Sequence, residues 1–324
     1  MINNLAAILG ALVVLTGTAN AQKVQPAPAF PERPVRVLVG APPGSGSDVL
    51  IRLAAQRLAP RWRHNIVVDN RPGAGGSIAF DVASRANPDG YTIIIGNSQN
   101  LTSFAARTSL VDITTALRPI VRMSTLPFLL VITPSLPAGS VKELVALARS
   151  KPLAFASSGN GTITHLGMEM FSSRAKIAMT HVPYKGSGQS MIDLIGGQVH
   201  LAMTNTLTSM PLVKSGKLRT LGVTSSQRLE SAPQIPTLAE SGLPGFELIA
   251  WYGLFGPLGT PQPVLAKINA DVTDLFQTPE MRERLAASGS EPAAKNSPAQ
   301  FKKLLDQELG GWERLIKSQA IRFE

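Results

Sequence analysis

The stretch Pro-Val-Arg-Val-Leu-Val-Gly-Ala-Pro-Pro-Gly-Ser-Gly-Ser-Asp, residues 34–48, joins two different sequence periods. Alternating valines from Val35 to Val39 are typical of a buried parallel strand, and the apolar positions in 50–58 follow a helical period. A glycine-rich turn therefore connects a strand to a helix, which we expect to be capped by Ser47 or Asp48. The free N–H groups and positive end of that helix favour an anion at the turn, although a tight βα loop without a ligand explains the same residues.

The following residues repeat this order of elements. A strand is expected at 65–68, then a glycine-rich turn and a helix over 77–85, and a third strand at 91–96 ends in the polar loop Asn97–Asn100. This alternation of strands and helices predicts a parallel sheet in an α/β domain. Its carboxyl edge would carry both the turn at 42–48 and the polar loop, and such sheets bind ligands at this edge.

A second α/β unit is expected to begin near residue 126. Its strand at 153–156 leads through the turn Ser157–Thr162 into a helix that contains His165. The combination of strand, glycine turn and helix therefore occurs twice in the chain. Further strands of this unit are expected at 129–132, 179–182, 199–203 and 218–223.

The chain then returns to the first unit. Prolines and glycines between Ser231 and Gly245 indicate a crossing, a strand is expected at 249–255, and residues 263–316 follow a helical period. We therefore predict two lobes with the boundaries 22–125 plus 248–324 and 126–247.

The first 21 residues have the pattern of a secretory signal peptide. Residues 3–21 contain no charged side chain, residues 5–15 form an apolar run, and Ala19-Asn20-Ala21 supplies the small residues of a cleavage site. A membrane-spanning helix is the alternative, but it needs about 20 apolar residues. We therefore expect export to the periplasm and cleavage after Ala21, which leaves a chain long enough for two domains.

The composition limits the classes of partner. The formal net charge is +10, but basic residues are scattered singly or in pairs and aromatic residues make up only 5% of the chain. Nucleic-acid binding normally needs a basic stripe or stacking aromatic side chains, so we expect no nucleic acid and a surface that favours anionic ligands. The chain has no cysteine, which excludes disulfides and thiolate chemistry.

No catalytic, metal or cofactor motif stands out. The four histidines are too scattered for a metal site, and chelation by His165 with Glu169 is less well supported than a ligand contact by His165. Neither a Gly-x-Ser-x-Gly elbow nor a Gly-Lys-Ser/Thr phosphate loop is present. We therefore expect no metal, no cofactor and no catalytic residue.

Many short segments together resemble one family, the Bug-type extracytoplasmic solute receptors of tripartite tricarboxylate transporters. The resemblance covers nearly the whole chain after the leader, and its segments follow one another in the family's order. The segments that carry it include Pro42–Gly44 with Asp48, Val68–Gly76, Pro88–Thr92, Ser158–Thr162 with His165 and Leu166, His181–Gly186, Trp251–Gly253 and Gly259–Pro261.

The resemblance implies an α/β fold of the type II periplasmic binding protein kind, with two lobes and a ligand cleft between them. It also implies that the two glycine turns and ordered waters hold the carboxylate of a small organic acid. In the first lobe the corresponding positions are Pro43, Gly44, Ser47 and Asp48. In the second lobe they are Ser158, Gly159, Asn160, Gly161, Thr162 and His165. Further candidates at strand ends facing the cleft are Ser98 and Asn205.

These observations predict a monomeric periplasmic receptor that captures a carboxylate-bearing acid for subunits of a membrane transporter. Neither glycine turn contains Lys or Arg, so we expect backbone N–H groups, helix N-termini and the hydroxyls of Ser47 and Thr162 to hold the carboxylate. The alternative is a hydrolase or transferase that acts on a small acid and is built on the same two lobes.

Overall fold

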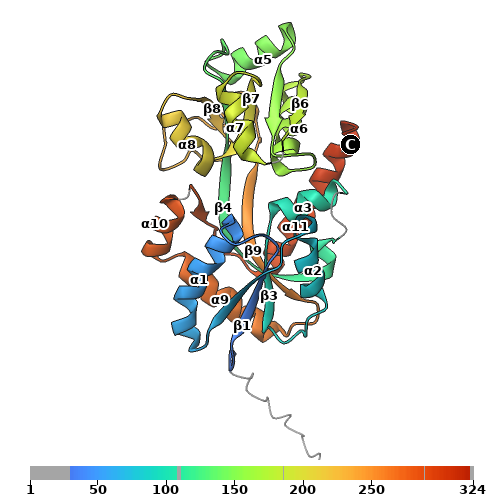
Figure 1. The fold of residues 1–324 in the computed structure, drawn as a ribbon, viewed down its shortest axis with the longest axis vertical. Helices are drawn as coiled ribbons and strands as arrows, with labels where there is room; N and C mark the ends of the chain where they lie inside the picture. Colours follow the sequence, from blue (N-terminus) through green and yellow to red (C-terminus); the bar gives the residue numbers. More distant parts are fainter. Residues whose placement is uncertain (1–29, 108–110, 185, 288, 322–324) are drawn as a thin grey trace, which may run out of the picture.

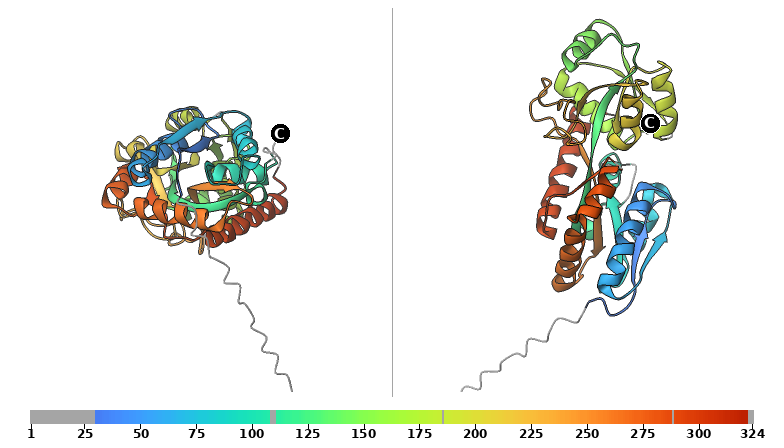
Figure 2. Two further views of the ribbon diagram at one scale, coloured as in Figure 1. Left: turned by 90° about the horizontal axis from the view of Figure 1, so that it is seen from below. Right: turned by 90° about the vertical axis from the view of Figure 1, so that its left-hand side faces the viewer.

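The computed structural model describes residues 30–107, 111–184, 186–287 and 289–321. The predicted signal peptide and its cleavage site lie outside the described residues. The protein is a mixed α/β protein of two lobes stacked along its long axis (Figures 1 and 2). No helix in the described ranges is both long and apolar enough to cross a membrane.

Lobe 1 is built on a sheet with the order β2-β1-β3-β9-β4. Strand β1 is parallel to β2 and β3, whereas β9 is antiparallel to both of its neighbours, β3 and β4. The short strand β10 pairs with β4. The bounds of these strands are β1 Val35–Val39, β2 Ile66–Asn70, β3 Thr92–Asn97, β4 Leu117–Ile132, β9 Ile249–Pro257 and β10 Glu291–Pro292.

Helices cover both faces of this sheet. Val35, Val37 and Val39 pack in one buried cluster with residues of α1 and α9, while Leu38 packs on the other face with residues of α2, α3 and α11. Burial on both faces explains why four of the five residues of β1 are apolar. The helical elements of lobe 1 are α1 Gly46–Trp62, η1 Ala74–Gly76, α2 Ser77–Ser84, α3 Ser98–Ala105, α4 Ile113–Ala116, α9 Gln262–Phe276, α10 Pro279–Ala287 and α11 Pro298–Ser318.

Lobe 2 is built on the far half of β4. This half pairs with β7 on one side and β8 on the other, and β5 and β6 continue the sheet beyond β7. The strands are β5 Ala154–Ser157, β6 Thr180–Pro183, β7 Leu201–Asn205 and β8 Arg219–Val223. The helices are α5 Val141–Ser150, α6 Ile163–Ala175, α7 Ser187–Ile195 and α8 Thr206–Lys214.

Strand β4 runs through both lobes, which the sequence did not reveal. It pairs with β9 from Leu117 to Pro127 and with β7 from Phe128 onward, so one unbroken strand changes partners at the junction. The prediction of a strand at 129–132 captured only its end, because Pro119 and Pro127 resemble breaks in a strand. A register shift beside Pro119 accommodates that residue. The lobe boundary between 125 and 126, which falls within this strand, stays a prediction.

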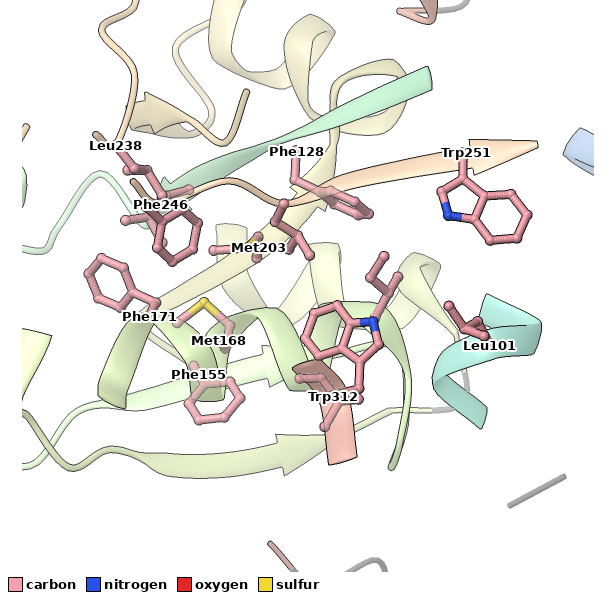
Figure 3. Packing of buried hydrophobic residues seen from close by; sticks show 14 of the residues in the cluster. Leu101, Phe128, Phe155, Met168, Phe171, Met203, Leu238, Phe246, Trp251 and Trp312 are labelled. Atoms are coloured by element: carbon pink, nitrogen blue, oxygen red, sulfur yellow. The ribbon is translucent and has the colours of Figure 1, made fainter. Parts of the chain in front are cut away.

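The largest buried cluster also extends through both lobes. It includes Phe128 from β4, Met203 from β7 and Trp251 from β9, which are labelled in Figure 3. The Trp251 ring meets Phe301 of α11 edge to face, with ring centroids 5.2 Å apart. The junction between the lobes is therefore well packed, and Phe128, Met203 and Trp251 all recur in the cavity described next.

Candidate functional site

A cavity of about 180 Å³ lies between the lobes, at the ends of strands from both sheets. Lobe 1 contributes the end of β3, the first turn of α3 and the first residues of β9. Lobe 2 contributes the ends of β5 and β7 and the first turns of α6 and α7. The lining residues are Asn97, Ser98, Gln99, Leu126, Phe128, Ala156, Ser157, Ser158, Ile163, Thr164, Ser187, Ser190, Met191, Ala202, Met203, Thr204, Asn205, Ala250, Trp251 and Tyr252.

Four helices begin at this cavity. Ser98 starts α3, Ile163 starts α6, Ser187 starts α7, and Asn205 is the N-cap of α8. A helix N-terminus presents free N–H groups and a partial positive charge of about +0.5. Among the described residues, the lining contains no Lys, Arg, His, Asp or Glu. The ends of these helices are therefore the source of partial positive charge in the described part of the wall.

The first glycine turn lies outside the lining of this cavity. Helix α1 begins at Gly46 and its N-cap is Ser45, whose hydroxyl accepts a hydrogen bond from the N–H of Asp48, so the expectation of Ser47 or Asp48 as the cap was wrong. The four residues nominated in this turn are absent from the lining, and their contact with a ligand stays a prediction: Pro43, Gly44, Ser47 and Asp48.

The carboxylate of Asp48 holds this first turn together. It is 2% exposed and accepts hydrogen bonds from the N–H of Gly44, from Nδ2 of Asn70 and from Nε of Arg52, at 2.9–3.0 Å. The hydrogen bond from Arg52 is the largest of the effects that lower the pKa of Asp48 to about 2. The negative charge is therefore compensated within the turn.

The first turn still reaches the cavity indirectly, through Tyr252. A Cβ atom at Gly46 would lie only 2.5 Å from the hydroxyl oxygen of Tyr252, a residue of the cavity wall. A larger residue at position 46 would therefore displace the hydroxyl end of Tyr252 in the cavity wall.

In the second glycine turn, Ser158 lines the cavity, whereas the N-cap residue of α6 is not part of the lining. Thr162 is the N-cap of α6: its hydroxyl accepts from the N–H of His165 and donates to the carbonyl of Gly159 at 2.7 Å. Thr164, which the sequence analysis did not nominate, lines the cavity instead and accepts a hydrogen bond from the N–H of Ser158 at 3.0 Å. Ligand contacts by Gly159, Asn160, Gly161 and Thr162 stay predictions.

His165 lies behind this turn in a stack of rings. It is 2% exposed, its Nδ1 accepts from the N–H of Gly161 at 3.2 Å, and its ring lies parallel to that of His181 at 3.7 Å. Burial, with a smaller contribution from His165, lowers the pKa of His181 to about 4. His181 is therefore neutral at physiological pH, and His165 supports the turn from outside the cavity lining.

Gln99 connects the two lobes across the cavity. Its Oε1 accepts a hydrogen bond from the N–H of Ile163 at 3.3 Å, so a neutral acceptor on α3 of lobe 1 meets the N-terminus of α6 in lobe 2. Ser98, beside it, accepts from the N–H of Trp251 at 2.8 Å. Asn205 caps α8 by accepting from the N–H of Thr208.

Residues 50–321 match the family described as the tripartite tricarboxylate transporter family receptor. The chain belongs to this family. The receptor is 30% identical to the protein BugT of Bordetella pertussis over 328 residues, which is 99% of this chain and 100% of BugT. The family predicted from the sequence is thereby confirmed.

Solved structures confirm the predicted fold class as well. The receptor superimposes on R. palustris Rpa4515 with adipate at a TM-score of 0.77 and 34% identity, covering 90% of this chain and 99% of that one. It superimposes on MatC from Rhodopseudomonas palustris with bound malate at a TM-score of 0.73 and 29% identity. The superposition covers 89% of this chain and 100% of MatC. Both neighbours carry their acids on the same two-lobed fold.

The cavity of the receptor brings together three of the nominated residues, Ser98, Ser158 and Asn205. The sequence analysis missed other polar residues of the wall: Asn97, Gln99, Ser157, Thr164, Ser187, Ser190 and Thr204. For Asn97 and Gln99 the sequence did contain an indication of a place at the site, because the polar loop Asn97–Asn100 was expected at the binding edge of the sheet. In the described ranges, no group of three or more His, Cys, Asp or Glu side chains is placed to hold a metal ion.

Proposed function

We propose that this protein is a monomeric periplasmic receptor that binds a small organic acid in the cavity between its lobes and delivers it to a tripartite transporter in the membrane. The observation that carries the proposal is the convergence of four helix N-termini on a cavity whose described lining residues have no ionised side chain. Such termini bind anions without any cationic residue. The acids carried by Rpa4515 and MatC support the same ligand class.

The first turns of α3, α6 and α7 would supply the hydrogen bonds to the carboxylate. Hydrogen bonds from such donors to a charged acceptor contribute about 1.5–3 kcal/mol each, so three of them would contribute about 4.5–9 kcal/mol, which corresponds to dissociation constants from roughly millimolar to below micromolar. Ser158 and Thr164 place hydroxyls at the same wall, while the glycine turn behind them would act through ordered water.

Calorimetry on the purified mature protein tests this proposal. We expect at least one acid among butanoate, hexanoate, succinate, malate and adipate to bind saturably, and its uncharged amide to bind at least about a hundredfold more weakly. Two lost charge-assisted hydrogen bonds would account for that difference. Equal affinity for acid and amide, or no binding of any acid at millimolar concentration, would contradict the proposal. Light scattering on the same sample should give the mass of one chain.

We also propose that the protein binds its ligand without converting it. The described residues of the cavity wall include neither a carboxylate nor an imidazole that would serve as a general acid or base. The alternative, a hydrolase or transferase, predicts loss of the bound acid on prolonged incubation. The acid recovered after calorimetry should therefore be chemically unchanged, and a product that accumulates with time would establish an enzyme.

Export follows from the leader, which we propose is cleaved after Ala21. The uncharged residues 3–21 and the small residues before Gln22 support this site. Mass spectrometry of the protein recovered from the periplasm should show a chain that begins at Gln22. A secreted chain that retains Met1 would exclude cleavage.

A further inference from the structure

Glu308 is an acidic side chain that lies directly behind the wall of the ligand cavity. It belongs to α11, and its Oε2 accepts a hydrogen bond from Nε1 of Trp251 at 2.8 Å. Trp251 lines the cavity, and its own N–H donates to Ser98, the first residue of α3. A single residue, Trp251, therefore connects the carboxyl group of Glu308 with the cavity wall.

Glu308 also lines a second cavity, which has a volume of about 420 Å³ and lies between α6 and α11. Helix α11 belongs to lobe 1, but its C-terminal half reaches α6 of lobe 2 (Figure 1). Glu308 is therefore placed at the junction of the lobes, between two cavities. Because the residue is partly exposed, its carboxyl group can exchange protons with the solvent.

The charged groups around Glu308 come from several elements. Arg122 on β4 and Glu247, which precedes β9, act on it through their charges. Arg174 of α6 and Arg314 of α11 line the same second cavity. Enclosure by protein atoms has the largest effect and raises the pKa of Glu308 to about 7, although the indole hydrogen bond and Arg122 oppose it. Near neutral pH, this carboxyl group is therefore divided between its ionised and neutral forms.

The two forms both hold Trp251 but differ in their effect on an anion. A neutral carboxyl group keeps an acceptor oxygen for the indole N–H, whereas an ionised one also repels a negative ligand. Because the ligand cavity is small, a carboxylate in it would lie on the order of 10 Å from Glu308, and at an effective dielectric constant of about 20 two like charges at this separation change an acid equilibrium about tenfold. A bound anion therefore favours the neutral form of Glu308.

We propose that Glu308 is a proton-binding site coupled to the ligand cavity, so that the receptor takes up one proton from the solvent at Glu308 as it binds its acid. The inference rests on the proposed function, since it takes the binding of an anion between the lobes as given. Coupling between two binding sites is reciprocal, so protonation of Glu308 strengthens ligand binding. The affinity for the acid therefore falls as the pH rises above neutrality and Glu308 becomes ionised.

Calorimetry in two buffers measures the proton directly. The heat of binding of the best-binding acid at about pH 7.5 is compared in HEPES and in Tris, whose ionisation enthalpies differ. We expect an uptake of about half a proton per ligand at this pH, and an affinity about five- to tenfold lower at pH 9 than at pH 6.5. Clear binding without proton uptake would overturn the inference and leave the proposed function intact. If no acid binds at all, the proposed function fails and the inference fails with it.

Glu308→Gln tests the residue, because Gln keeps an acceptor oxygen for Trp251 and cannot ionise. We expect this variant to take up no proton and, at pH 9, to bind the acid about five- to tenfold more tightly than the parent protein. Glu313→Gln is the matched control, since Glu313 lies on the same helix and is exposed. It should behave as the parent protein does.

A residue that only supported the packing of Trp251 would give a different result. Its replacement would weaken binding at every pH and would leave the proton uptake unchanged. Proton uptake that persists in a folded Glu308→Gln protein, or that is lost equally in Glu313→Gln, would therefore overturn the role of Glu308.

Discussion

Gln99→Glu is expected to lower the affinity of the receptor for carboxylate ligands by about a hundredfold or more. The substitution keeps the size of the side chain and adds a negative charge beside the N–H of Ile163, at the N-terminus of α6. Two like charges about 5 Å apart repel each other by roughly 3 kcal/mol at an effective dielectric constant of about 20. Calorimetry with the best-binding acid measures the loss.

Gln99→Met is the control for this substitution. It removes the amide and the hydrogen bond between the lobes without adding charge, and we expect its affinity to stay within about fivefold of the parent protein, since one neutral hydrogen bond contributes about 1 kcal/mol. The uncharged amide of the same acid should bind both variants equally. If Gln99→Glu binds the acid as tightly as the parent protein, the carboxylate does not lie near the N-terminus of α6.

Asp48→Asn is expected to lower the free energy of unfolding by about 2–3 kcal/mol. The change removes the buried charge that accepts from Arg52, and it turns an amide N–H group toward donors at Gly44 and Asn70. This decrease in the free energy of unfolding is small for the loss of a buried ion pair, because the side chain of Arg52 is itself 47% exposed. Denaturant unfolding at pH 7 measures the difference. Ligand affinity of the folded variant should change by less than about threefold, as Asp48 lies outside the cavity lining.

The pH dependence of stability gives an independent test of Asp48. Its pKa is about 2 in the folded protein and near 3.8 in an unfolded chain, so its stabilisation is present above about pH 4 and is lost as the pH falls toward 2. Over this pH range, the parent protein loses roughly 2 kcal/mol of its free energy of unfolding through the protonation of Asp48. In the Asp48→Asn variant, the free energy of unfolding should not show this contribution to the decrease between about pH 4 and pH 2.

Asp306→Asn supplies the matched control for these measurements. Asp306 pairs with Lys302 one turn away on α11, as Asp48 pairs with Arg52 on α1, but both members of the Asp306–Lys302 pair are about half exposed. Exposed pairs of this kind contribute about 0.3–0.5 kcal/mol. An equal loss of stability in Asp48→Asn and Asp306→Asn would show that the first turn does not depend on the buried carboxylate.

Local periodicity was sufficient to predict most strands and both glycine turns. The run Val35–Val39 is β1, and the helical period after it is α1, because burial on both faces of a sheet and on one face of a helix leaves distinct patterns. Strand β4 could be predicted only at its end, since prolines in a strand look like breaks until the pairing with β9 and its register shift are known.

The site was harder to predict than the fold. The sequence identifies a cap such as Thr162 but does not show which neighbouring hydroxyl faces a cavity, and the structure places Thr164 there. Gln99 and Ile163 are 64 positions apart, so their hydrogen bond depends on how the lobes meet. Thr204 belongs to no sequence motif, and its place in the cavity wall depends on the fold.

The place of β9 in the first sheet has a consequence for biosynthesis. This strand lies between β3 and β4, yet it is the last long strand that the ribosome produces. The strands of lobe 2 are complete once residue 223 has been made, whereas lobe 1 lacks a central strand until Ile249–Pro257 has emerged. Pairings between segments so distant in the chain form slowly. The segments of lobe 1 that are made first therefore cannot complete their sheet until the strand from the C-terminal quarter of the chain has been made.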